Sequence, residues 1–72
     1  MEFSIFGKIY SQLINGPFCQ VVNGHYLPVL PRTVFHGDNV VAALPFHRGL
    51  MLLCTEFNGL YIYDGHRISP LK

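Results

Sequence analysis

The segment VVAALPFHRGLMLLCTEFNGLYIYDGHRIS, residues 40–69, decides the fold class, because runs of β-forming residues alternate there with turn dipeptides. Asn58-Gly59 and Asp64-Gly65 follow apolar runs and are strong hairpin signals, since Asn, Asp and Gly tolerate the positive φ of tight turns. Arg48-Gly49 marks a third turn, although arginine is a poor residue at positive φ. The segment predicts an antiparallel meander with strands near 40–47, 50–57, 60–63 and 66–69.

The N-terminal half carries the same punctuation. Asn15-Gly16-Pro17, Asn23-Gly24 and His36-Gly37 interrupt β-rich runs and predict strands near 3–10, 18–22, 25–30 and 33–36. Residues 1–14 are ambiguous, because their apolar spacing fits a short amphipathic helix about as well as a strand; Gly7 favours the strand. The chain therefore predicts one small all-β domain over residues 1–72, an antiparallel barrel or sandwich built of short hairpins.

The composition excludes several classes of protein. Only 12% of the 72 residues are charged and 50% are hydrophobic, whereas an average soluble domain is about 25% charged. Intrinsic disorder requires the opposite balance, so we expect a packed domain. Domains of fewer than about 70–80 residues usually need disulfides, a metal or oligomerisation for stability. The composition and length therefore indicate that this domain needs one of these additional sources of stability.

The compartment is inferred from what the sequence lacks. The N-terminus has no basic start followed by an apolar run, so no signal peptide is predicted, and no stretch approaches the ~18 apolar residues of a membrane span. Cys19 and Cys54 lack the dense spacing of secreted disulfide scaffolds and are expected to be reduced. These features predict an intracellular protein.

The predicted C-terminal meander is apolar on both faces if the three turns have two residues each. The expected core face gathers Val40, Ala42, Leu44, Phe46, Met51, Leu53, Thr55, Phe57, Leu60 and Ile62. The opposite face gathers Val41, Ala43, Pro45, His47, Leu50, Leu52, Cys54, Glu56, Tyr61, Tyr63, His66 and Ile68. A solvated sheet face should be polar, so a second cover from another chain is expected. A slip of one residue would exchange the two sets and leave this conclusion unchanged.

Catalytic and metal-binding patterns are weak. The four histidines, His25, His36, His47 and His66, lie beside turns without zinc-ligand spacing, so no metal site and no cofactor are expected. In the assumed register Cys54 pairs with Tyr63, which places Cys54 one strand away from His66 and near Asp64. That trio is too dispersed for a nucleophilic site, and no enzyme activity is predicted.

Nucleic-acid binding is the first alternative to a protein partner. Small barrels bind single strands by stacking bases on aromatic rings beside basic residues, and Tyr63 with Arg32, Arg48 and Arg67 offers such a set. The five cations are scattered and the net charge is +1, which argues against nucleic acid.

We therefore expect a non-enzymatic interaction or assembly protein, a subunit of a homo-oligomer or larger complex. A viral or phage structural component, incorporated into a virion, is one such assembly. Prolines cannot donate to a strand ladder, so the segment with Pro28 and Pro31 is expected at an edge that contacts a neighbour. The predicted interface residues are Leu50, Leu52, Tyr61, Tyr63, Ile68, Pro28 and Pro31. A small inhibitor that occupies a partner's groove is the second alternative.

Overall fold

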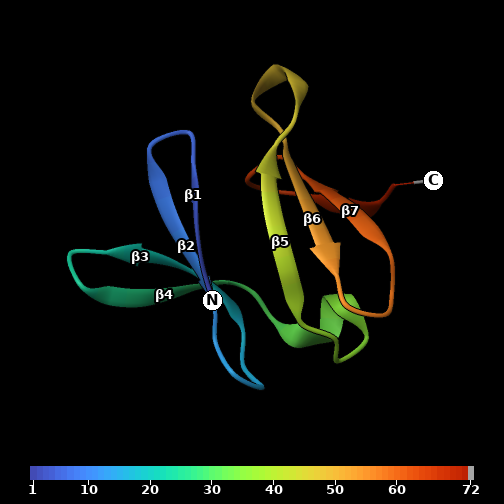
Figure 1. Cartoon of the computed structure of the whole chain (residues 1–72), viewed down its shortest axis with the longest axis horizontal. Helices are drawn as coiled ribbons and strands as arrows, with labels where there is room; N and C mark the ends of the chain where they lie inside the picture. Colours follow the sequence, from blue (N-terminus) through green and yellow to red (C-terminus); the bar gives the residue numbers. More distant parts are fainter. Residues whose placement is uncertain (72) are drawn as a thin grey trace.

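A computed structural model describes residues 1–71 as two four-stranded antiparallel sheets that lie side by side (Figure 1). The N-terminal sheet is a meander of β1 (Glu2–Ile5), β2 (Lys8–Gln12), β3 (Phe18–Val22) and β4 (His25–Leu30). The C-terminal sheet is a meander of β5 (Val40–Pro45), β6 (Met51–Thr55), β7 (Leu60–Tyr63) and β8 (Ile68–Pro70). The all-β prediction is confirmed, and the sheets form an open sandwich of hairpins rather than a closed barrel. Lys72, one of the five cations, lies outside the described residues.

Two of the three hairpins of the N-terminal sheet close with two-residue turns, and five residues join β2 to β3. Asn23-Gly24 links β3 to β4, with φ of 51° and 78°, and Phe6-Gly7 links β1 to β2, with φ of 52° and 75°. Positive φ at both central residues identifies type I′ turns, which match the twist of the flanking strands. The ambiguous segment 1–14 is thus strand, and the run predicted as one strand over 3–10 breaks at a turn that begins with a phenylalanine.

Two short 3₁₀ helices interrupt the strand pattern. The first, η1 (Arg32–Phe35), replaces the strand predicted near 33–36, because its amides bond backward: Val34 N donates to Pro31 O at 3.2 Å. Left-handed His36, at φ 57°, ends it. The second, η2 (His47–Gly49), lies in the β5–β6 loop and holds Arg48 at φ 61°.

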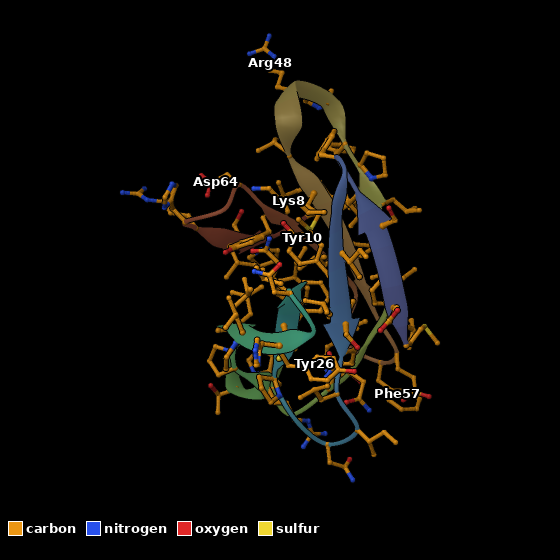
Figure 2. The ribbon with its side chains drawn as sticks, turned by 90° about the vertical axis from the view of Figure 1, so that its left-hand side faces the viewer. Lys8, Tyr10, Tyr26, Arg48, Phe57 and Asp64 are labelled. Atoms are coloured by element: carbon orange, nitrogen blue, oxygen red, sulfur yellow. The ribbon has the colours of Figure 1, made fainter. Side chains whose placement is uncertain are left out.

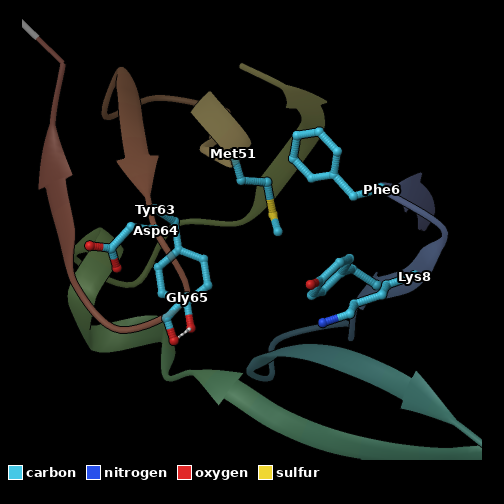
Figure 3. A pocket seen from close by; sticks show the side chains of 8 residues that line it. Phe6, Lys8, Met51, Tyr63, Asp64 and Gly65 are labelled. Carbon is cyan, nitrogen blue, oxygen red and sulfur yellow. Dashed lines mark hydrogen bonds between the residues drawn. The ribbon is translucent and has the colours of Figure 1, made fainter. Parts of the chain in front are cut away.

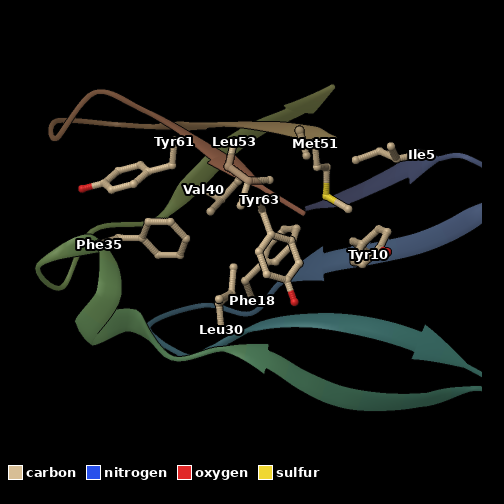
Figure 4. Close-up of a cluster of buried hydrophobic side chains, with 11 residues drawn as sticks. Ile5, Tyr10, Phe18, Leu30, Phe35, Val40, Met51, Leu53, Tyr61 and Tyr63 are labelled. Atoms are coloured by element: carbon tan, nitrogen blue, oxygen red, sulfur yellow. The ribbon is translucent and has the colours of Figure 1, made fainter. Parts of the chain in front are cut away.

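The core lies between the two sheets, and both contribute aromatic rings to it (Figure 4). Tyr10 stacks on Phe18 within the N-terminal sheet, with centroids 5.6 Å apart and planes 3° apart. Phe35 of η1 meets Tyr61 of β7 edge to face at 5.1 Å. Aromatic pairs in these geometries contribute beyond the area they bury, so they help to fix the two sheets in place.

Buried polar side chains join the two sheets. The Gln12 Oε1 atom accepts the Val40 amide at 3.0 Å in a buried position, and its Nε2 donates to the carbonyls of Leu13 and Gly16. Asp38 is 6% exposed and accepts the amides of Asn39, Phe57 and Asn58 at 2.6–2.9 Å. These bonds link the start of β5 to β2 and to the β6–β7 loop.

The loops of the C-terminal sheet are longer than two residues, and this changes the predicted register. Cys54 pairs with Leu60 and Met51 with Tyr63, whereas a two-residue Asn58-Gly59 turn would pair Phe57 with Leu60. The slip of three residues, an odd number, exchanges the faces of β7. The first loop differs by one residue, since Pro45 rather than Phe46 pairs with Met51, and a bulge between Val40 and Ala42 keeps Val40 inside.

Candidate interaction surface

The outward face of the C-terminal sheet is a regular grid of eight side chains that carries no charge. Residues paired across an antiparallel sheet share a face, so the register defines two rows. We call these eight residues the outer face. One row is Leu44, Leu52, Ile62 and Ser69, and the other is Ala42, Cys54, Leu60 and Leu71. Leu71 extends β8 through its amide, which donates to Leu60 O at 2.9 Å.

The outer face is open to solvent at its margins and half-buried at its centre. Leu44 is 50% exposed, and Leu60 and Leu71 are each 41% exposed, while Leu52 and Ile62 are intermediate. Seven of its eight residues are apolar, whereas an antiparallel sheet with one solvated face normally carries polar residues there. The sheet is therefore apolar on both sides, as the sequence indicates, although several residues occupy the side opposite to the predicted one.

The predicted interface residues divide between the two sides of the C-terminal sheet. Leu52 lies on the outer face, and half-buried Leu50 lies between η2 and β6, outside the paired strands. The placement of Tyr61, Tyr63 and Ile68 on this side is wrong, because the β6–β7 slip turns them inward; both tyrosines are 7% exposed and Ile68 packs against the core.

Leu44, Leu60 and Ile62 take the places of Tyr61, Tyr63 and Ile68 on the outer face, although the sequence pattern assigns them to the core. No local signal distinguishes the two registers, because both put apolar residues on each side.

The proline-bearing segment lies at an edge of the N-terminal sheet, as predicted for an edge strand. Pro28 is exposed in β4, which is the last strand of that sheet, and exposed Pro31 precedes η1. Its contact with a neighbour remains a prediction.

The residues proposed for nucleic-acid stacking do not form one platform. The Tyr63 ring is in the core, and its hydroxyl donates to Gly65 O at 3.0 Å. The Arg32 guanidinium bonds to Gly37 O, while the Arg48 side chain extends outward from the tip of the η2 loop (Figure 2) and Arg67 lies in a different loop, between β7 and β8. A stacking site requires an exposed ring beside the cations, and Tyr63 cannot supply one.

The Cys54, Asp64 and His66 trio is also dispersed. Cys54 pairs with Leu60 at the end of β7 opposite to Asp64, so the predicted pairing with Tyr63 is wrong. The Asp64 carboxylate accepts the amides of His66 and Arg67, and these bonds lower its pKa. Within residues 1–71, no three His, Cys, Asp or Glu side chains gather in a way that could hold a metal ion.

Both cysteines are free thiols, in different environments. Cys19 of β3 is fully buried, and this burial raises the pKa of its thiol. Cys54 is half-buried on the outer face. Because the thiolate is the reactive form and needs access to reagent, Cys54 reports on whether this face is covered.

Comparisons of the chain with protein-family models, with curated proteins and with solved structures found no match. Among the described residues, no helix is long and apolar enough to cross a membrane. Any function assigned to this chain therefore rests on its own residues.

Proposed function

We propose that this chain is a non-enzymatic assembly protein that associates with copies of itself through the outer face of its C-terminal sheet. The observation that carries the proposal is the two-row grid of aliphatic residues without a charged group. A second copy is the occupant that suits this surface, because an uncharged face meets no like charge when it packs against itself. Two such sheets pack about 10 Å apart, as in a β-sandwich.

The size of the face sets the expected strength of the contact. Four strands about 4.8 Å apart and five residues at about 3.4 Å each give a footprint of roughly 14 by 17 Å. This is smaller than the ~800 Å² per partner of a standard interface, so the contact belongs to the weaker class. We therefore expect self-association at micromolar concentration. Two copies that pack face to face form a dimer, and other edges would be needed for larger assemblies.

The test is a comparison of two double variants of equal chemistry in sedimentation experiments over a range of concentrations. Leu44→Lys with Leu60→Lys places two charges on the outer face, at side chains that are 50% and 41% exposed. Ile9→Lys with Tyr26→Lys places two charges on the outward row of the N-terminal sheet, at side chains that are 46% and 51% exposed. The proposal predicts that the first pair abolishes association while the second leaves it unchanged.

A thiol measurement gives an independent result on the same samples. In the wild type, the reaction of Cys54 with a thiol reagent should slow as concentration rises, because the partner covers the outer face. Fully buried Cys19 is the internal reference for unfolding, since it reacts only when the domain opens. A wild type that remains monomeric at micromolar concentration, or an equal loss of association in both double variants, would overturn the proposal.

A further inference from the structure

The two sheets diverge at one end of the sandwich and leave a cleft there (Figure 3). It consists of two adjoining cavities of about 310 Å³ and 370 Å³, which share Lys8, Tyr10, Tyr63 and Gly65. Ligand sites for small molecules start at about 300 Å³ and combine apolar walls with a few convergent polar groups. The cleft is on the inner side of both sheets, so it is separate from the outer face.

The hydrogen-bond donors of the cleft come from one sheet. Lys8 and Tyr10 lie on β2, and Gln20 pairs with Tyr10 across the β2–β3 ladder. The Lys8 ammonium group points into the cavity (Figure 3), and burial raises the pKa of the Tyr10 hydroxyl, which stays protonated at neutral pH. These three side chains present an ammonium, a phenol and an amide, a set that suits an oxyanion.

The opposite wall is apolar or already engaged. Met51 of β6 lines it with a thioether, and the Tyr63 hydroxyl donates its proton to Gly65 O at 3.0 Å, while Phe6 adds an aromatic ring from the β1–β2 turn beside Lys8. Asp64 is the only carboxylate among the lining residues, and it is turned away from Lys8 (Figure 3) to accept the amides of His66 and Arg67 at 2.7 and 2.6 Å. The charge that faces the cavity is therefore positive.

We propose that the cleft binds a small carboxylate with a flat apolar body. The carboxylate would lie against Lys8, Tyr10 and Gln20, and the apolar body against Met51 and Phe6. One ammonium group matches the single charge of a carboxylate better than the double charge of a phosphate monoester. The volume suits one or two aromatic rings.

Phe6 adds a second observation. It stands at φ 52° in the β1–β2 turn, where a bulky residue costs about 1–2 kcal/mol relative to glycine, and it is 55% exposed. A residue held in a strained conformation needs a compensating reason, and such residues cluster at ligand sites. The ring over the cleft supplies that reason, because it provides an apolar wall that Asn or Gly would lack.

The experiment is an amide-resolved NMR titration of the wild-type chain with 2-naphthoate at neutral pH. We expect saturable shifts at residues that line the cleft and at least about tenfold weaker binding of uncharged 2-naphthalenemethanol. Lys8→Met should weaken the binding of 2-naphthoate by a similar factor, whereas Lys8→Arg should retain the binding. Arg67→Met is the matched control, since it removes one positive charge from an exposed loop outside the cleft.

Three results would overturn the inference: no saturable shift, shifts that map to the outer face, or equal affinity in Lys8→Met and wild type. Inorganic phosphate is titrated in parallel. If phosphate binds as tightly as 2-naphthoate, the cleft does not select a carboxylate with an apolar body, and the inference fails. None of these results depends on self-association, so the assembly proposal stands or fails separately.

Discussion

The two sheets share a strand order and differ in their outward faces and in their loops. Both meanders bury aromatic and aliphatic residues inward, but the outward side of the N-terminal sheet includes the exposed polar residues Glu2 and Ser4, whereas the outer face has no charge and Ser69 as its one polar residue. Two of the three connections in the N-terminal sheet are two-residue turns and the third, between β2 and β3, has five residues, whereas every loop of the C-terminal sheet has four or five. One strand order therefore carries a charged, partly polar outward side in the N-terminal sheet and an uncharged apolar one in the C-terminal sheet.

The largest expected effect comes from truncating a buried tyrosine of the C-terminal sheet, compared with an exposed tyrosine of the N-terminal sheet. Tyr61→Ala removes a ring that is 7% exposed and packed on Phe35, and should cost about 3–5 kcal/mol of unfolding free energy. Tyr26→Ala removes a ring that is 51% exposed and should cost less than about 1 kcal/mol. Urea denaturation measures both. Equal costs would show that the C-terminal register is wrong.

A second prediction concerns the join between the sheets. Gln12→Leu leaves the buried Val40 amide without its 3.0 Å acceptor and should destabilise the domain by about 1–3 kcal/mol. Gln20→Leu, on the adjacent strand and half-buried, should change the stability by no more than about 0.5 kcal/mol. Native-state amide exchange should show faster exchange at Val40 in the first variant. An unchanged Val40 rate would mean that Gln12 does not connect the sheets.

A third prediction tests why the C-terminal sheet tolerates long loops. Burial would raise the pKa of Asp38, but bonds from the amides of Phe57, Asn39 and Asn58 outweigh it and lower the pKa. A carboxyl whose folded pKa lies below the unfolded value of about 3.9 stabilises the fold above that value. This stability is lost as pH falls through the folded pKa.

The measurement for Asp38 is thermal unfolding from neutral pH to strongly acidic solution. Asp38→Asn should lower the Tm at neutral pH. The difference in Tm between this variant and the wild type should become smaller below about pH 4. Asp64→Asn is the control in an exposed loop and should lower the Tm less. A gap that stays constant with pH would show that the Asp38 charge does not hold the β6–β7 loop.

The smallest effect compares the two type I′ turns of the N-terminal sheet. Phe6→Asn replaces a bulky residue at φ 52° with one that tolerates this conformation, and should stabilise the fold by about 1 kcal/mol. The reciprocal Asn23→Phe should destabilise it by a similar amount. Phe6→Asn should also weaken 2-naphthoate binding, so a variant that gains stability and keeps its affinity would remove Phe6 from the cleft.

The strands of this protein could be predicted well, and their faces only in part. Six of the eight strands lie within or close to predicted runs because Asn-Gly, Asp-Gly and Pro mark boundaries locally. The turn at Phe6-Gly7 was not predicted, because phenylalanine is not a residue typical of turns. The strand expected near 33–36 became η1 because its amides bond to carbonyls three residues back.

The sequence by itself determined that this chain is an all-β domain and that its C-terminal sheet is apolar on both sides, since alternation and turn chemistry are local properties. Only the tertiary structure decided which apolar set faces solvent. Loop length sets register, and an odd slip of one or three residues exchanges the faces of a strand at almost no cost when both are hydrophobic. Packing against Phe35 and the N-terminal sheet selects Tyr61 and Tyr63 for the core and leaves Leu44, Leu60 and Ile62 outside.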